Sequence, residues 1–515
     1  MVYIGANELT LQDFNNILYN GELIDLDQKA LEKVRQSHEF LKDFSKDKLI
    51  YGINTGFGPM AQYKISNNNQ LDLQYNLIRS HCTGAGKLLS NVEVKSAMIC
   101  RLSSLMQGFS GIHPEVVILL KDLINNNVSP QIFEHGGVGA SGDLVQLAHL
   151  ALNLIGEGEV TYNGQLRPTA DVYNELGLKP ITIHLREGLA LINGTSIMTG
   201  ISMVNVSHAT QLVNWSISAS MMIIELVESY SDHFSTELNK VKPHRGQRTI
   251  ANTMDTLMRD SKLVRKREEH LYSKETTDVD VFKDKVQEYY SIRCVPQILG
   301  PIWDTVNYTQ SVIQNEVNSV NDNPIIDKEN NNVFHGGNFH GDYVALEMDK
   351  LKIAVTKLSM LAERQLNFLM NDKLNGKLPP FVNLGKLGLN LGMQAAQFTA
   401  TSTTAENQML SNPMYIHSIP NNNDNQDIVS MGTNAALITS KVIENTYQVM
   451  AIELLSIVQA IDALSFDTKL SSQSQKIYHQ IRDIKARFET DSILYKDLEK
   501  IKLFLQKNSP EILTN

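Results

Sequence analysis

The 515-residue chain has little cysteine, with only Cys82, Cys100 and Cys294. So sparse and odd a count argues against a framework of structural disulfides and is typical of proteins from a reducing cytoplasm. Residues 1–8 lack the basic start and apolar core of a signal peptide. The most apolar segment, residues 449–464, contains Glu453 and other polar residues, so we expect no helix that spans a bilayer. These features predict a soluble, cytoplasmic protein.

Basic residues are also outnumbered: the chain has 46 Lys and Arg residues and 56 Asp and Glu residues, which gives a net charge of −10. This balance argues against a general nucleic-acid partner or an anionic membrane surface. Charged residues make up only 20% and hydrophobic residues 42% of the chain, so we expect a folded core rather than disorder. The densely charged segment 259–280 mixes both signs, which indicates a solvated helix end or loop.

No motif for pyridoxal phosphate, nicotinamide or a phosphate-binding loop can be found in the chain. His335 and His340 are close in sequence, but their spacing matches no helical ligand pair, so we expect no metal site there. A reaction that needs an electrophile must therefore obtain it in another way.

The run His135-Gly-Gly-Val-Gly-Ala-Ser-Gly-Asp143 offers such an electrophile. The amide nitrogen of Gly142 is unhindered and can attack the carbonyl carbon of Ala140, and Ser141 between them can lose its hydroxyl. Loss of two waters would give 4-methylidene-imidazol-5-one (MIO), a ring with an electrophilic methylene. The surrounding glycines relax the steric limits on such a compressed turn. The competing interpretation is a glycine-rich turn before a helix.

Asp143 opens an apolar run over residues 144–155, as the N-cap of a helix does. The N-terminus of that helix would hold partial positive charge beside the ring and make it more electrophilic. We therefore expect a helix from Leu144, capped by Asp143.

Seven blocks in matching order make the chain resemble the aromatic amino acid ammonia-lyases, which are built on MIO. The blocks begin at residues 51 (Tyr-Gly-Ile-Asn-Thr-Gly-Phe-Gly), 135, 188, 290 (Tyr-Ser-Ile-Arg-Cys-Val-Pro-Gln), 321, 336 (Gly-Gly-Asn-Phe-His) and 425 (Asn-Gln-Asp). The resemblance extends from about Tyr51 to Met431. It implies a lyase of carbon–nitrogen bonds with MIO formed from Ala140, Ser141 and Gly142, and no metal.

The resemblance also implies roles for single residues. Tyr51 matches the family's catalytic base, and Arg293 would bind the substrate carboxylate through a bidentate fork. Phe339 would pack against the electrophile or the substrate ring. Further matching positions would orient the substrate, with packing or a structural hydrogen bond as the competing account: Asn193, Tyr290, Gln426, Asn425, Gln287 and Glu406.

The side-chain-recognition pair of the family falls on Ser80 and His81, a combination common in histidine enzymes. Histidine enzymes carry Ala-Pro where this chain has Val145-Gln146, however. The sequence segments 133–146 and 413–425 instead resemble those of tyrosine ammonia-lyases of flavobacterial type. These enzymes also carry Ser-His at the recognition pair. We predict deamination of L-tyrosine to p-coumarate, with histidine ammonia-lyase and an MIO-dependent aminomutase as alternatives.

The expected fold is mainly α. Long apolar segments with helical spacing cover residues 187–230, 338–371 and 427–464, which predicts a bundle of long helices. The resemblance implies the long-helix bundle of the fumarase/aspartase-like superfamily and a homotetramer with shared active sites. We expect an N-terminal part (1–185) with both catalytic loops, a bundle core (186–468) and a helical tail (469–515). We also expect Thr10 to cap a helix, an ordered active-site loop at 51–64 and a polar loop at 421–425.

Overall fold

The computed structural model describes residues 1–272, 280–282, 285–510 and 512–513. Residues 273–279 of the charged segment 259–280 lie outside the described residues. The chain forms two compact units, each assembled from three stretches. Unit 1 comprises residues 1–207, 309–349 and 413–440, and unit 2 comprises residues 208–308, 350–412 and 441–515.

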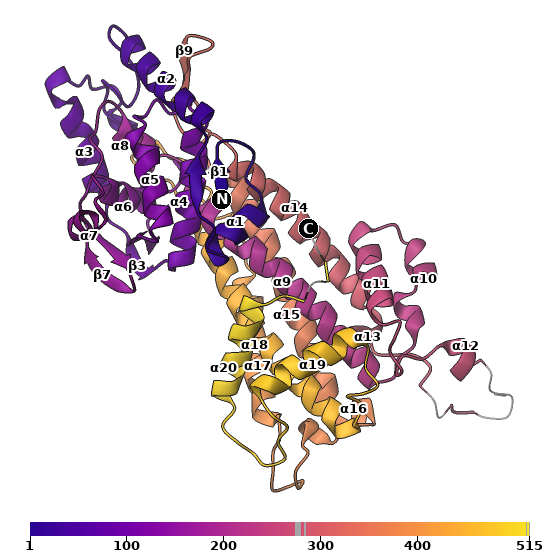
Figure 1. Cartoon of the computed structure of the whole chain (residues 1–515). Helices are drawn as coiled ribbons and strands as arrows, with labels where there is room; N and C mark the ends of the chain where they lie inside the picture. Colours follow the sequence, from indigo (N-terminus) through magenta and orange to yellow (C-terminus); the bar gives the residue numbers. More distant parts are fainter. Residues whose placement is uncertain (273–279, 283–284, 511, 514–515) are drawn as a thin grey trace. The chain divides into compact units, whose positions relative to one another are not determined.

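Unit 1 combines short helices with short strands (Figure 1). Its helices are α1 (Leu11–Tyr19), α2 (Gln28–Phe44), α3 (Gln70–His81), α4 (Asn91–Met106), α5 (Glu115–Asn125), α6 (Leu144–Leu154), α7 (Thr169–Leu176) and α8 (Glu187–Ile192). Its core centres on α4, in which all residues from Ser96 to Met106 are buried. Thr10 caps α1 as expected, because its side chain accepts from the backbone N–H of Asp13 in a capping box.

The strands of unit 1 were not expected from the sequence, and each has two to four residues. They pair as β1 (Val2–Ile4) with β2 (Ile24–Leu26) in parallel, and β3 (Ala85–Leu88) with β5 (Phe133–His135) antiparallel. The antiparallel sheet β4-β6-β7 is formed by Ser129–Pro130, Glu159–Tyr162 and Gln165–Pro168, and β8 (Ile325–Asp327) pairs antiparallel with β9 (Asn332–Phe334). Strands this short lack a hydrophobic period long enough to be recognised.

Four long helices contribute residues to both units: α9 (Ser196–Leu226), α14 (Val295–Val317), α15 (Asp342–Met370) and α18 (Gly432–Leu464). They confirm the prediction of long helices, although α15 and α18 begin a few residues later than expected. The predicted continuous helix over 187–230 was wrong, since the chain breaks between α8 and α9. At the break Gly194 has φ +147°, and a Cβ there would lie 2.5 Å from a guanidinium nitrogen of Arg101.

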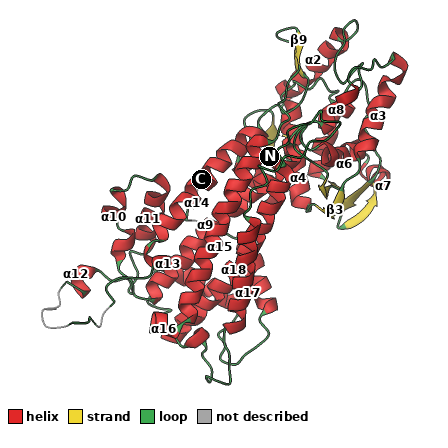
Figure 2. Cartoon of the chain, turned by 180° about the vertical axis from the view of Figure 1, so that it is seen from behind, coloured by secondary structure: helices red, strands yellow, loops and turns green. Residues whose placement is uncertain are grey.

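The elements described in unit 2 are helices, and the long ones run side by side (Figure 2). The remaining helices are α10 (Thr236–Lys240), α11 (Arg245–Leu257), α12 (Arg267–His270), α13 (Tyr290–Arg293), α16 (Asp372–Asn375), α17 (Gln394–Leu410), α19 (Ser472–Ile484) and α20 (Tyr495–Lys507). Helices α19 and α20 confirm the expected helical tail. Among the described residues, α18 alone is long and apolar enough to cross a membrane, but 78% of its apolar window is buried inside the protein, as in a core helix.

Candidate active site

Unit 1 contains a cavity of about 630 Å³ whose lining comes from seven separate segments of the chain. The principal lining residues are Tyr51, Phe57, Met60, Leu73, Asn76, Leu77, Ser80, His81, Ser141, Leu144, Leu189, Ile192, Asn193, Asn323, Phe339, Asn422, Asn423, Asn425 and Gln426. The cavity therefore brings together most of the site residues expected from the sequence. Its volume is in the range of small-molecule sites.

The glycine-rich loop at the cavity is compressed against another segment. Gly142 has φ +70°, and a Cβ on it would lie 1.9 Å from the carbonyl oxygen of Gly194, so that only glycine fits here. Gly142 and Gly194 form an isolated parallel β-bridge. The N–H of Asp143 donates to the same Gly194 oxygen at 2.8 Å. Gly142, the residue whose nitrogen would close an imidazolone ring, is thus held in a left-handed conformation against Gly194.

Ser141 accepts hydrogen bonds from polar side chains at both its hydroxyl and its backbone carbonyl. Gln426 donates through Nε2 to the Ser141 hydroxyl at 3.0 Å, and Asn193 donates through Nδ2 to the Ser141 carbonyl at 3.2 Å. We call Ser141, Asn193, Gln426 and Tyr51 the reaction wall of the cavity. Asn193 is buried, so its amide is fixed for this contact.

Tyr51 is held by its own loop. Residues 51–64 form an ordered turn closed by a bridge between Thr55 and Lys64, which agrees with the expected ordered loop. The N–H of Gly58 donates to the Tyr51 phenolic oxygen at 3.1 Å, and the ring of Phe57 stands edge-on to that of Tyr51 at 6.2 Å between centroids. These contacts orient a phenol in the cavity wall.

Asp143 does not cap its own helix, contrary to the prediction. Its carboxylate accepts from the N–H groups of Ile197 and Met198, both at 2.9 Å, in the first turn of α9. It also accepts from the hydroxyl of Thr433. Complete burial raises the pKa of Asp143 from 3.8 to about 6, against the lowering effect of these hydrogen bonds. Asp143 therefore joins the glycine-rich loop to the start of α9, and its side chain does not cap the N-terminus of α6.

One face of α3 forms a second part of the lining, which we call the recognition wall: Leu73, Asn76, Leu77, Ser80 and His81. The positions follow helical spacing and therefore lie on one side of α3. The Nδ1 of His81 lies 2.9 Å from the carbonyl oxygen of Leu77 and 3.2 Å from the Ser80 hydroxyl. A carbonyl only accepts hydrogen bonds, so in neutral His81 the proton is on Nδ1 and Nε2 is an acceptor.

The expected polar loop at 421–425 is confirmed. Asn422, Asn423 and Asp424 have φ values of +55°, +52° and +55°, a region that asparagine and aspartate tolerate better than most residues. The loop is closed by paired backbone hydrogen bonds between Asn421 and Gln426 at 3.1 and 3.3 Å. This closure places Gln426 at the cavity.

Four expected site residues belong to unit 2 and do not line the cavity: Gln287, Tyr290, Arg293 and Glu406. Tyr290 is 70% exposed, and the Arg293 guanidinium lies 4.7 Å from the centre of its ring. Glu406 is exposed on α17 and accepts a 2.6 Å hydrogen bond from Asn445. The described residues that line the cavity therefore include no arginine or lysine to bind a substrate carboxylate.

Sequence reasoning missed several contributors to the cavity and its support. Leu73, Asn76 and Leu77 could have been found, because they precede Ser80 and His81 at helical spacing. No local signal marks Thr433 or Gly194, whose partners Asp143 and Gly142 are distant in sequence.

Comparison with known proteins identifies the family of the chain. A family model described as aromatic amino acid lyase matches residues 9–483. The chain is 37% identical to a tyrosine 2,3-aminomutase from Chondromyces crocatus, over 98% of this chain and 96% of the relative. It is 38% identical to a probable histidine ammonia-lyase from Thermoplasma volcanium, over 99% of each chain.

Among solved structures, a tyrosine aminomutase from Streptomyces globisporus superimposes with a TM-score of 0.94 at 34% identity, covering 98% of this chain and 97% of the other. The mainly helical architecture predicted from the sequence is thus confirmed. The chain belongs to the aromatic amino acid lyase family, whose members include ammonia-lyases and aminomutases.

Proposed function

We propose that the protein is a tyrosine ammonia-lyase, which converts L-tyrosine to p-coumarate and ammonia with MIO formed from Ala140, Ser141 and Gly142. The observation that carries the proposal is that Ser141, Tyr51 and His81 line the same cavity. An electrophile precursor, a phenolic base and a partner for the substrate side chain thus share one space. We further propose that the enzyme acts in the cytoplasm as a homotetramer.

The ring would supply an electrophile for the substrate amine, which would turn that amine into a leaving group. Tyr51, as the phenolate, takes the proton of the β-carbon onto its phenolic oxygen, and the electrons of that C–H bond form the new double bond as the C–N bond breaks. Before the ring closes, Asn193 and Gln426 hold the Ser141 segment in place through its carbonyl and its hydroxyl, and the contact of Asn193 with the carbonyl can persist in the ring. Phe339, Asn425 and Asn193 border the remaining substrate space.

His81 supports tyrosine as the substrate. The phenol of bound tyrosine is a hydrogen-bond donor, and the free Nε2 of His81 is an acceptor on the recognition wall. A buried hydroxyl without a partner costs about 1–3 kcal/mol, so this contact favours tyrosine over phenylalanine. The imidazole of a histidine substrate can donate to the same nitrogen, which keeps histidine as the competing substrate.

The unit 2 residues imply a shared site. Arg293 with Tyr290, Gln287 and Glu406 would reach the cavity of another chain in the tetramer, where Arg293 binds the substrate carboxylate. Co-expression of Tyr51→Phe and Arg293→Lys chains tests this arrangement. Mixed tetramers should regain activity that neither variant has alone, because some sites then combine an intact Tyr51 with an intact Arg293. Mixed tetramers as inactive as the parents would contradict shared sites.

Curated and structural relatives named as tyrosine aminomutases favour a second candidate, a mutase that returns ammonia to the β-carbon. Incubation with tyrosine, histidine and phenylalanine side by side distinguishes the reactions. Rapid p-coumarate with equimolar ammonia supports the proposal. Accumulation of β-tyrosine would identify a mutase, and dominant urocanate would identify a histidine ammonia-lyase.

A further inference from the structure

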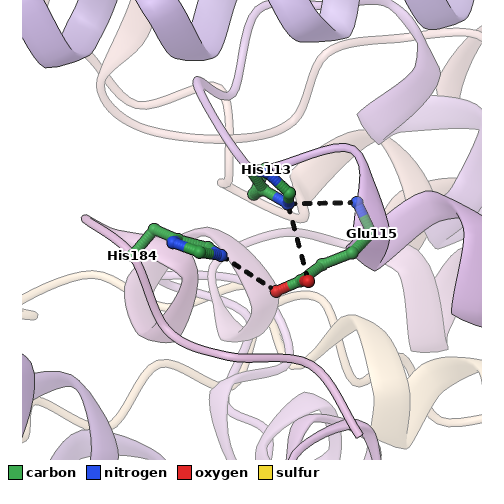
Figure 3. A group of neighbouring side chains, drawn as sticks. All are labelled: His113, Glu115 and His184. Atoms are coloured by element: carbon green, nitrogen blue, oxygen red, sulfur yellow. Dashed lines mark hydrogen bonds and ion pairs between the residues drawn. The ribbon is translucent and has the colours of Figure 1, made fainter. Parts of the chain in front are cut away.

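Two histidines and a glutamate converge in unit 1 outside the residues that line the cavity (Figure 3). His113 and Glu115 lie at the start of α5, and His184 lies in the segment between α7 and α8. His113 Nδ1 is 3.7 Å from Glu115 Oε2, and His184 Nε2 is 3.1 Å from Glu115 Oε1. One donor atom from each residue lies within 4.8 Å of the other two.

These spacings suit a metal ion. In a tetrahedral site with bonds of about 2.0–2.2 Å, neighbouring ligand atoms lie about 3.3–3.6 Å apart. The observed 3.1 and 3.7 Å run to different oxygens of Glu115 and fall on either side of that range. The Nδ1 of His113 also accepts a 3.4 Å hydrogen bond from the N–H of Glu115, which a bound metal ion would replace. The two histidine rings lie 4.3 Å apart with an angle of 35°, so both face the same carboxylate from neighbouring positions (Figure 3).

A buried carboxylate fixes the backbone of both histidines. Glu187, whose side chain is fully buried, accepts from the N–H of His113 at 3.0 Å and from the N–H of His184 at 2.9 Å. The N–H of Thr182 also donates to Glu115 Oε1 at 2.8 Å. Groups that orient ligands in this way are a regular part of metal sites, because they reduce the cost of ordering the ligands.

We propose that His113, Glu115 and His184 bind a divalent ion of the zinc class. Two imidazole nitrogens and one carboxylate oxygen are ligands that zinc accepts. The side chains are 37%, 34% and 39% exposed, so the ion can enter from solvent and water can complete its coordination. The ion would join α5 to the segment that leads into α8, whose C-cap is Asn193 of the reaction wall.

The test uses the full-length protein, stripped with chelator and then titrated with ZnCl₂. We expect one tightly bound zinc per chain after desalting, and a rise in melting temperature upon addition of zinc. His184→Ala and Glu115→Gln should each weaken binding at least tenfold and abolish the rise. His479→Ala, which removes an exposed histidine from α19, is the matched control and should bind zinc as the parent does.

Circular dichroism of the metal-free variants checks their folding, and His184→Asn offers a smaller change if His184→Ala does not fold. Cobalt provides a second measurement, because a cobalt ion bound by nitrogen and oxygen shows no thiolate charge-transfer band. Zinc binding that survives both the His184 and the Glu115 substitution, a thiolate band, or no retained zinc in the parent protein would each overturn the proposal. Zinc retention that depends on both His184 and Glu115 would support it.

Discussion

The two walls of the cavity are built in different ways. The reaction wall is assembled from segments that are distant in sequence, with Gln426 donating to Ser141 across 285 positions. The recognition wall is one face of the single helix α3. A side chain on such a face can change without moving the backbone, whereas the reaction wall depends on many contacts at once. Under the function that we propose, a substitution on α3 would change substrate selectivity and leave the contacts of the reaction wall in place.

The largest effect is expected when the reaction wall loses the precursor of its electrophile. Ser141→Ala has no β-hydroxyl to eliminate, so activity should fall by roughly 10⁴-fold or more. Intact-mass measurement should find the parent chain lighter than its sequence by two waters and the variant at full mass. Ser80→Ala, on the recognition wall, is the control and should keep the deficit. A parent chain at full mass with normal activity would refute the mechanism.

The next effect concerns the base. Tyr51→Phe keeps the ring that packs beside Phe57 and removes only the oxygen, so kcat should fall by about 10²–10⁴. Steady-state kinetics with tyrosine measures the loss. The Gly58 N–H loses its acceptor, so thermal unfolding should be compared to show that the fold is retained. Near-native turnover would mean that another group is the base.

A change on the recognition wall should alter selectivity and leave the chemistry in place. His81→Phe removes the acceptor for the substrate phenol, so the ratio of kcat/KM for tyrosine over phenylalanine should fall by roughly ten- to a few hundred-fold. Competition between the two substrates measures the ratio directly. An unchanged ratio, or a loss of turnover with both substrates as large as that of Ser141→Ala, would contradict the separation of the two walls.

The smallest effect concerns the stability that the buried Asp143 gives the folded protein. Burial raises the folded-state pKa of Asp143 from 3.8 to about 6, so the folded protein holds this proton more tightly than the unfolded chain does. The stability that results is fully present below about pH 4 and is lost as the pH rises through 6. It amounts to at most roughly 3 kcal/mol.

Asp143→Asn is neutral at every pH and should lack this dependence. Denaturant unfolding of both proteins between pH 4 and pH 7 measures the difference, in which the titration of other carboxyl groups cancels. The free energy of unfolding of the parent should fall relative to the variant across that interval. Parallel profiles would show that Asp143 titrates in the folded protein as it does in the unfolded chain.

Features set by neighbouring residues could be predicted from the sequence, and those set by distant contacts could not. The capping box at Thr10, the turn at 421–425 and the long helices depend on local pattern. The break at Gly194 depends on Gly142 and Arg101, and apolar spacing alone continues through it. The sequence predicts that Asp143 caps the helix that follows it, because an aspartate at that position usually does. In the structure its carboxylate instead accepts hydrogen bonds from the first turn of α9. The residues of unit 2 were found only through the family resemblance.

The long sequence separation of the reaction wall has a consequence for how the enzyme is made. Ser141 meets Asn193 52 positions later and Gln426 285 positions later, so a chain still on the ribosome lacks the partners that hold this serine. The ring closure that we propose would then wait until synthesis is almost complete. An unfinished or misfolded chain would carry an ordinary serine, and the reactive methylene would arise only inside a finished cavity, out of reach of other amines in the cell.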